Sequence, residues 1–269
     1  MSGPSHPSAG GLLELRGTRK VFPSRRAGSP PVDALGPIDE DIRHGEFLAI
    51  VGPSGCGKST LLSLISGLDF PTAGHIRLNG QMIKGAQSEL GIVFQKDLLL
   101  PWRTTIDNVL LQAELRDMNM AQARARAMEL LETVGLKGFE NFYPHELSGG
   151  MRQRVSICRG LLHNPQLLLM DEPFASLDAI TRDQMSIDFQ AFWGKSRTTV
   201  IFITHNISEA IFLADRVAVM TTRPGRFAEV IDIDLPRPRE LAIRETSEFA
   251  RYAAHIRELF EQHGIFKKT

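Results

Sequence analysis

The sequence predicts an α/β fold built on a parallel β-sheet, and two observations carry this prediction. A glycine-rich segment, Gly52–Thr60 (GPSGCGKST), stands between an apolar strand-like run, Phe47–Val51, and an apolar helix-like run, Leu61–Ile65. Further along the chain, apolar strand-like runs alternate with helical segments, which is typical of a parallel sheet with helices on both faces. Those runs are Leu167–Met170, Thr199–Thr204 and Arg216–Met220.

The front of the chain is rich in strand patterns. Leu12–Phe22 alternates well enough to be predicted as an edge strand, and a loop with three prolines follows over Pro23–Pro31. A second strand is predicted around Asp33–Ile42, and it leads through a turn into Phe47–Val51. The first residues, 1–11, are rich in Ser, Gly and Pro, and we expect them to form a disordered tail.

A helical insertion is predicted between about Lys96 and Asn164. Before it, Ile76–Leu78 is predicted to be a short strand with an Asn-Gly turn, and Gly91–Phe94 a buried strand with Gln95 at its end. Within it, Thr104–Asp107 can cap a helix. A further helix is indicated by an apolar stripe that Gly135 ends, with the members Ala127, Met128, Leu130, Leu131 and Val134.

These patterns also give the domain boundaries. Prolines at Pro236 and Pro238 break the chain after the last strand, and a final helix is predicted over about Glu240–Phe260. We therefore expect one domain over residues 12–236, which contains the helical insertion, and a C-terminal helical extension over residues 237–269.

The composition is that of an ordinary globular protein. The 269 residues are 42% hydrophobic, and Lys+Arg and Asp+Glu both number 31, so the formal net charge is zero. A net charge of zero gives no electrostatic reason to expect that the protein binds nucleic acid, and we expect no such partner. The two cysteines, Cys56 and Cys158, suit a reducing compartment. No stretch approaches the roughly 20 apolar residues of a membrane span, so we expect a soluble chain in the cytosol.

The glycine-rich segment predicts a nucleoside triphosphate site. It fits the pattern G-x-x-x-x-G-K-[ST] in a strand–loop–helix context. Its backbone N–H groups can turn inward on a polyphosphate, and the positive end of the following helix points at the same place. We expect Lys58 to reach the outer phosphates and Ser59 to ligate magnesium. The expected nucleotide contacts are Gly52, Ser54, Gly55, Cys56, Gly57, Lys58, Ser59 and Thr60.

Two adjacent carboxylates end the apolar run Leu167–Met170. Ligands bind at the carboxyl ends of parallel strands, so Asp171 is expected to hold magnesium through its water shell. Glu172 would orient and polarise the water that attacks the terminal phosphate. The alternative is a strand that simply ends in exposed acids. His205 follows another strand and could hydrogen-bond the terminal phosphate, although a lone histidine there is more often structural.

A second anion-binding element is predicted at Leu147–Arg154 (LSGGMRQR). There Ser148 and two glycines stand at the start of a helix pattern, in a chain whose first loop already has its phosphates. Either this is only a turn before a helix, or it binds nucleotide held by another copy of the protein.

Together these motifs resemble the ATP-binding subunits of ABC transporters, over roughly Leu12–Pro236. The resemblance implies a P-loop NTPase fold: a RecA-like parallel-sheet core, an N-terminal antiparallel β subdomain and an inserted α-helical subdomain at about 96–164. It implies ATP and Mg²⁺ as ligands, and a head-to-tail dimer, expected to be a homodimer, that encloses two ATP molecules. Gln95 then corresponds to the glutamine loop, a catalytic and metal-binding position, and His205 to the switch histidine.

The same resemblance assigns residues to both sides of the dimer. ATP held by Lys58 of one subunit would be enclosed by Ser148, Gly149 and Gly150 of the other. The loop Ala175–Asp178 would carry Asp178 across the dimer interface. Two positions depart from the family pattern. Phe22 replaces the tyrosine that stacks on adenine, which keeps the stacking, and Met151 replaces a glutamine near the ribose.

Other segments resemble importers. Tyr143–Glu146 is similar to importer sequences, while Phe94–Arg103 and Asp178–Met185 resemble the nitrate, sulfonate and taurine branch. This implies an integral-membrane permease, an indirect substrate-binding protein, and a peripheral location on the cytoplasmic face of the membrane. The apolar stretch Leu98–Trp102 either receives the permease's coupling helix or is buried within the helical subdomain.

Two other classes of protein compete with this interpretation. A non-transport ATPase of the same superfamily, in DNA repair or on the ribosome, needs a long coiled coil or two motif sets, and neither is present. A P-loop kinase or GTPase would leave Leu147–Arg154 and His205 unexplained.

Overall fold

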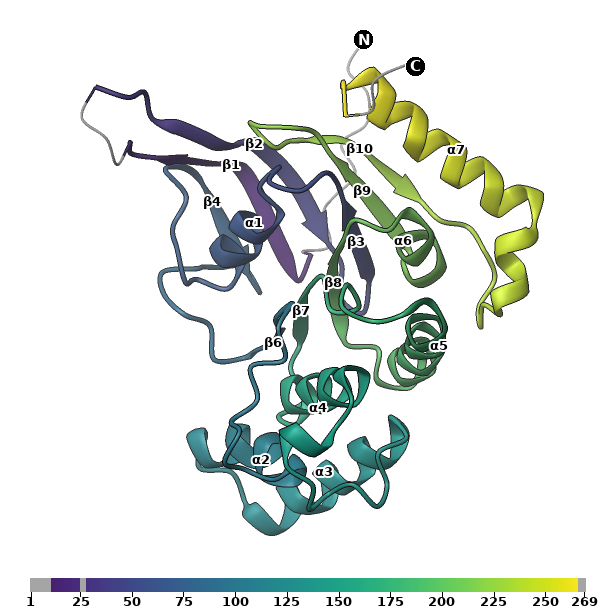
Figure 1. Ribbon diagram of the computed structural model, residues 1–269. Helices are drawn as coiled ribbons and strands as arrows, with labels where there is room; N and C mark the ends of the chain where they lie inside the picture. Colours follow the sequence, from purple (N-terminus) through teal and green to yellow (C-terminus); the bar gives the residue numbers. More distant parts are fainter. Residues whose placement is uncertain (1–10, 25–27, 266–269) are drawn as a thin grey trace.

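The protein, described here from a computed structural model for residues 11–24 and 28–265, is organised around a six-stranded sheet (Figure 1). The strand order is β10-β9-β3-β8-β7-β6, and all pairs are parallel except β10 with β9. The strands are β3 (Phe47–Val51), β6 (Leu90–Val93), β7 (Leu167–Asp171), β8 (Thr199–Thr204), β9 (Arg216–Met220) and β10 (Phe227–Asp232). The predicted parallel sheet is confirmed.

Alternating side chains of this sheet enter two different cores. In β8, Val200 and Phe202 pack into one hydrophobic cluster, whereas Ile201 and Ile203 pack into the other. Because both faces are covered, the strands are apolar at nearly every position, which is why they read as continuous apolar runs in the sequence.

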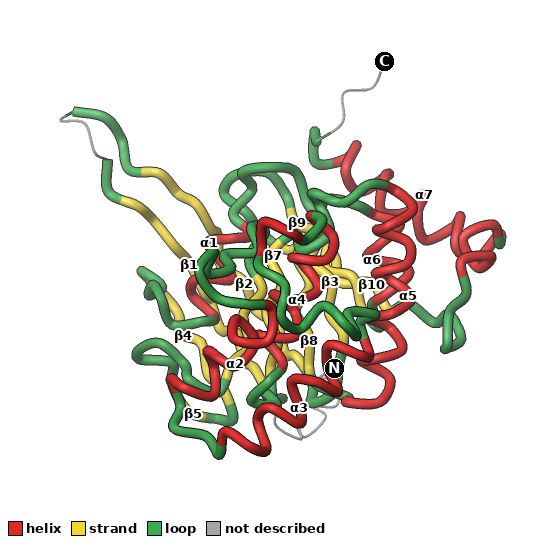
Figure 2. Tube along the Cα trace, turned by 60° about the horizontal axis from the view of Figure 1, so that its bottom comes forward, coloured by secondary structure: helices red, strands yellow, loops and turns green. Residues whose placement is uncertain are grey.

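A four-stranded antiparallel sheet covers one face, with helix α1 (Lys58–Ile65) between the two sheets (Figure 1). Its order is β2-β1-β4-β5, from β1 (Leu13–Phe22), β2 (Val32–Ile42), β4 (Ala73–Leu78) and β5 (Gln81–Met82). The prediction of β1 as an edge strand is wrong, since β1 pairs with β2 on one side and β4 on the other. The far ends of β1 and β2 project from the body of the molecule (Figure 2).

Helices cover the other face and one end of the sheet (Figures 1 and 2). Those at the end are α2 (Thr105–Leu115), α3 (Met120–Thr133), a 3₁₀ turn at Pro144–Glu146, and α4 (Gly149–Leu161). As predicted, the Thr104 side chain caps α2 by accepting from the Asp107 N–H, and Gly135 adopts a left-handed φ of 72° after α3. Met128, predicted in the apolar stripe, is instead 40% exposed.

The remaining helices lie along the sheet face. They are α5 (Ala179–Ser196), α6 (Ile207–Leu213) and α7 (Ser247–Gln262), with a 3₁₀ segment at Leu241–Glu245. The predicted final helix is therefore two elements, separated where Thr246 caps α7. Phe94, predicted within a buried strand, lies beyond β6 and is 36% exposed. Within the described residues, no helix is both long and apolar enough to cross a membrane.

The disordered tail predicted for 1–11 falls almost entirely on residues 1–10, which lie outside the described part of the chain. Gly11 is described, and it precedes β1.

His163, just after α4, makes the stability of this fold sensitive to acid. Its Nε2 hydrogen-bonds the Leu90 carbonyl at 3.2 Å, and its Nδ1 is buried without a partner. Burial, together with the charge of Arg116, lowers the pKa of His163 from 6.5 to about 4. The unfolded chain therefore takes up this proton first, so stability is full above pH 6.5 and is lost as pH falls towards 4.

His163→Gln is therefore expected to flatten the pH dependence of unfolding. Between pH 7 and pH 5 the wild type should lose on the order of 1–2 kcal/mol that the variant does not lose. Urea unfolding of both proteins at the two pH values measures this difference. An equal loss in both would show that folding does not lower the pKa of His163.

Candidate active site

The phosphate loop lies between β3 and α1, at the carboxyl end of the parallel strands. Gly57 has φ 113°, and a Cβ there would lie 2.7 Å from Leu35 Cδ2 and 2.9 Å from the Ala34 carbonyl oxygen. Only glycine fits this close approach to β2. The loop thereby turns straight into α1, whose first N–H groups, at Ser59 and Thr60, have no partner within the helix.

Lys58 is buried beneath this loop. Its Nζ donates to the carbonyl oxygens of Gly52 at 2.9 Å and Pro53 at 3.0 Å, and lies 3.8 Å from Glu172 Oε1. Only 5% of the side chain is exposed, and Lys58 lines the cavity described below. The Cys56 side chain is also buried, and burial raises the pKa of its thiol, so Cys56 can offer a ligand only backbone groups.

A cavity of about 340 Å³ brings together most of the predicted phosphate and metal residues. It is lined by Ser54, Gly55, Gly57, Lys58, Ser59, Thr60, Gln95, Asp171, Glu172 and Arg223. Within it, Asp171 lies near Ser59. Burial raises the pKa of Asp171, and the Glu172 charge adds to this, whereas Ser59 and Lys58 oppose it.

The donors in this cavity fit magnesium. Ser59, Gln95 and Asp171 offer a hydroxyl, an amide and a carboxylate, the hard oxygen ligands that Mg²⁺ prefers. In the described part of the chain, no group of three or more His, Cys, Asp or Glu residues is placed to hold a metal ion. A metal site here would therefore need the hydroxyl and the amide beside the carboxylates of the cavity.

Glu172 has an unusual backbone conformation. Its φ is 45°, in the left-handed region that costs a residue with a side chain about 1–3 kcal/mol. The Glu172 N–H still donates to the Ile203 carbonyl at 2.9 Å, so the residue stays attached to β8 as the chain turns. Its carboxylate lies 3.1 Å from Nδ1 of His205. Because an ionised carboxylate only accepts hydrogen bonds, we assign the proton of this contact to Nδ1.

Arg223 lines the same cavity, and sequence reasoning missed it. Its Nε donates to the Gly55 carbonyl at 2.7 Å, from the loop between β9 and β10. Gly225 in that loop also touches the phosphate loop, since a Cβ there would lie 2.1 Å from the Cys56 carbonyl oxygen. The nearest sequence signal is the Pro-Gly pair after Arg223. This pair indicates a turn, but it does not indicate that the turn contacts the phosphate loop.

Four of the predicted residues form a second group, outside this cavity. Ser148 caps α4 by accepting from the Met151 N–H, and Asp178 caps α5 by accepting from the Thr181 N–H. The two turns pack together, because a Cβ on Gly150 would lie 2.9 Å from Thr181 Cγ2. Ser148, Gly149 and Asp178 are exposed, and no residue of this group lines the phosphate-loop cavity.

Phe22, the predicted adenine contact, also lies outside the cavity. It pairs with Val32 at the far end of β1 and is 37% exposed, with Lys20 Nζ 5.0 Å from its ring centre. In the stretch Leu98–Trp102, Leu98 is 52% and Trp102 71% exposed, whereas Leu99 packs against the core. This stretch thus has both an exposed and a buried side.

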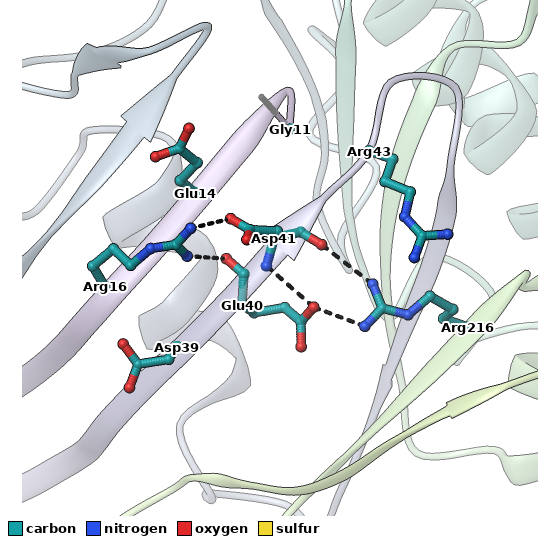
Figure 3. A pocket seen from close by; sticks show the side chains of 8 residues that line it. All are labelled: Gly11, Glu14, Arg16, Asp39, Glu40, Asp41, Arg43 and Arg216. Carbon is teal, nitrogen blue, oxygen red and sulfur yellow. Dashed lines mark hydrogen bonds and ion pairs between the residues drawn. The ribbon is translucent and has the colours of Figure 1, made fainter. Parts of the chain in front are cut away.

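A different cavity, of about 550 Å³, lies by the amino end of β3 and is lined mainly by charged side chains (Figure 3). Its charges pair with one another: Arg16 bonds Asp41 at 2.6 Å, and Arg216 bonds Glu40 at 2.8 Å. Arg216 also bonds the buried Glu46 at 3.0 Å. These ion pairs tie β1 and β2 to β9, which is a structural role.

Comparisons with known proteins agree with this geometry. The family model described as ABC transporter matches residues 35–175. The aliphatic sulfonates import ATP-binding protein SsuB of Bacillus licheniformis is 44% identical over 227 residues, covering 84% of this chain and 87% of that protein. The taurine import ATP-binding protein TauB of Rhizobium johnstonii is 44% identical over 244 residues, covering 89% and 93%.

A solved structure shares the fold. The ATP-binding cassette MJ0796, determined as a dimer in a post-hydrolysis state bound to ADP and Pi, matches with a TM-score of 0.73. It is 30% identical, and the match covers 84% of this chain and 100% of that chain.

Proposed function

The chain belongs to the ABC transporter family of ATP-binding proteins, and on that premise we propose that it is the ATP-hydrolysing motor of an importer. Its enzymatic activity is ATP hydrolysis. The observation that carries the assignment of residues is the cavity shared by the phosphate loop, Gln95 and the two acids at the end of β7, Asp171 and Glu172.

In this proposal Lys58 and the N–H groups that begin α1 bind the phosphates of ATP. Ser59, Gln95 and Asp171 would hold Mg²⁺, whose charge neutralises the phosphate oxygens when it is bound. Glu172 orients the attacking water and polarises it, and its left-handed backbone directs the carboxylate beside Lys58. His205, beside Glu172, contacts the terminal phosphate.

We further propose that a complete site needs two subunits. Ser148, Gly149, Gly150 and Asp178 would contact the nucleotide held by the phosphate loop of the partner. The separation of these residues from the chain's own cavity supports this arrangement, as does the dimer formed by MJ0796. ATP would then close the dimer and hydrolysis would open it, with Phe22 stacking on the adenine.

The membrane partner would be a permease that docks on Leu98–Trp102. Trp102 and Leu98 present apolar area to solvent and follow Gln95 closely in the chain, so movement of the docked element can be coupled to the nucleotide. We place the chain at the cytoplasmic face of the membrane, with a substrate-binding protein acting on the far side of the permease. The sulfonate and taurine import proteins support a small solute of the sulfonate or taurine type as cargo. A non-transport ATPase has no comparable support.

Co-expression with a permease encoded beside this chain tests the proposal. The two proteins should co-purify at high salt and take up solute into vesicles only with ATP, in the presence of the neighbouring binding protein. Co-purification with ribosomes or nucleic acid instead would favour the non-transport alternative.

Trp102→Ala should separate docking from hydrolysis. Because Trp102 is 71% exposed, its removal should leave the stability and the ATPase rate of the isolated subunit unchanged. Binding to the permease should weaken about tenfold or more, as for a buried interface anchor. Leu115→Ala, also 71% exposed, is the matched control. Equal permease binding by both variants would place the docking surface elsewhere.

A further inference from the structure

His205 lies on a segment that is held by hydrogen bonds to a residue outside the predicted site. Both of its chain neighbours are hydrogen-bonded to Glu209, the third residue of α6. The Thr204 hydroxyl donates to Glu209 Oε2 at 2.7 Å, and Asn206 Nδ2 donates to Oε1 at 3.3 Å. Glu209 is only 4% exposed, whereas His205 itself is exposed. The position of the imidazole thus depends on a carboxylate buried behind it.

The same carboxylate reaches the turn that carries Asp178. Arg182 Nε lies 3.3 Å from Glu209 Oε1, and its Nη2 donates to the carbonyl oxygen of Leu177 at 2.8 Å. Leu177 immediately precedes Asp178, whose side chain starts α5. One buried ion pair therefore joins β8 and α6 to the start of α5.

Positively charged groups surround the Glu209 carboxylate. Burial raises its pKa, while the Thr204 hydrogen bond and the charges of Arg182, His205 and Arg244 oppose that rise. Arg244 comes from the C-terminal segment, where it also bonds Asp183 at 2.5 Å and lies 4.9 Å from the Phe212 ring centre. A neutral side chain at position 209 would leave the partly buried Arg182 without a counter-charge from that residue.

We propose that Glu209 is a positioning residue for ATP hydrolysis, which joins the segment of His205 to the turn of Asp178 through Thr204 and Arg182. The inference rests on the roles proposed above for His205 and Asp178. In the dimer these two residues would serve different nucleotides, one in each site. Glu209 would then make the geometry of one site depend on that of the other.

Glu209→Gln tests the inference with little change in size. The amide oxygen can still accept from Thr204, but the charge facing Arg182 is lost. We expect kcat for ATP hydrolysis to fall about 10- to 100-fold, as for a misplaced catalytic group. KM and the affinity for ATP should stay within about twofold, because the hydrogen bonds and ion pair of Glu209 go to Thr204, Asn206 and Arg182 rather than to the phosphate loop.

Arg182→Gln should give the same loss of kcat, and the double variant should be no slower than the slower single one. If the losses of kcat in the two single variants multiply in the double variant, the link between Glu209 and Arg182 is refuted. Thr204→Val, which removes only the hydroxyl, is the second probe if Glu209→Gln folds poorly, and it should lower kcat in the same way.

Glu46→Gln is the matched control. Glu46 is also buried and paired with an arginine, Arg216, but lies before β3, at the opposite end of the strand from the phosphate loop. It should lower the melting temperature and leave kcat unchanged. A wild-type kcat in folded Glu209→Gln, or an equal loss in Glu46→Gln, overturns the proposal.

His205→Ala distinguishes the positioning role of Glu209 from the catalytic role of His205 on which it rests. Full hydrolysis by His205→Ala would refute the role of His205, and with it the role of Glu209. A slow His205→Ala beside a fully active Glu209→Gln would refute the positioning role alone.

Discussion

Glu172→Gln is expected to lower the rate of ATP hydrolysis by about 10²- to 10⁴-fold, the range associated with loss of a general base, while ATP still binds. The amide keeps the size of the side chain but cannot accept a proton from water. Lys58 and the phosphate loop are unchanged, so nucleotide affinity should remain within about threefold. Steady-state phosphate release and calorimetric ATP titration measure the two quantities. With hydrolysis blocked, the ATP-bound dimer should persist in light scattering.

Glu229→Gln is the control for this substitution. Glu229 also faces a histidine, with His255 Nε2 3.0 Å from its Oε1, but the pair is exposed and lies between β10 and α7. Its removal should change neither turnover nor dimer lifetime. Unchanged turnover in Glu172→Gln would refute the catalytic role, and the acid would then serve only to pair with Lys58 and His205 at the end of the strand.

The parts of the site that could be predicted are continuous in the sequence. The phosphate loop is one segment, and its glycines are required locally, as Gly57 shows by its left-handed φ and its contact with β2. Asp171 follows an apolar strand directly, so the edge of the sheet where it lies follows from the strand direction.

The parts that could not be predicted depend on contacts between distant segments. Arg223 reaches Gly55 from a loop 168 residues away, and nothing in its own neighbourhood indicates that contact. β1 reads as an edge strand because its second partner, β4, comes after α1 in the chain. Met128 fits the helical period, but its side chain is 40% exposed. Local pattern gives the period of a helix, whereas tertiary packing decides which face is buried.

Lys58→Ala is expected to weaken ATP binding about 10- to 100-fold, the loss of a charge-assisted hydrogen bond to phosphate. The change also removes the cation that lies 3.8 Å from Glu172 and opposes the rise in the pKa of Asp171. The two acids would then repel an incoming triphosphate more strongly. Calorimetric titration with ATP measures the affinity, and Lys137→Ala, an exposed lysine paired only with Glu132, is the control.

The two substitutions are informative together because they act on residues in direct contact but should fail differently. Lys58→Ala should lose affinity and recover part of its turnover at high ATP concentration, whereas Glu172→Gln should stay inactive when saturated. Normal ATP affinity in Lys58→Ala would mean that the backbone N–H groups of the loop and α1 hold the phosphates alone. Lys58 would then serve only to close the loop, through its bonds to the Gly52 and Pro53 carbonyls.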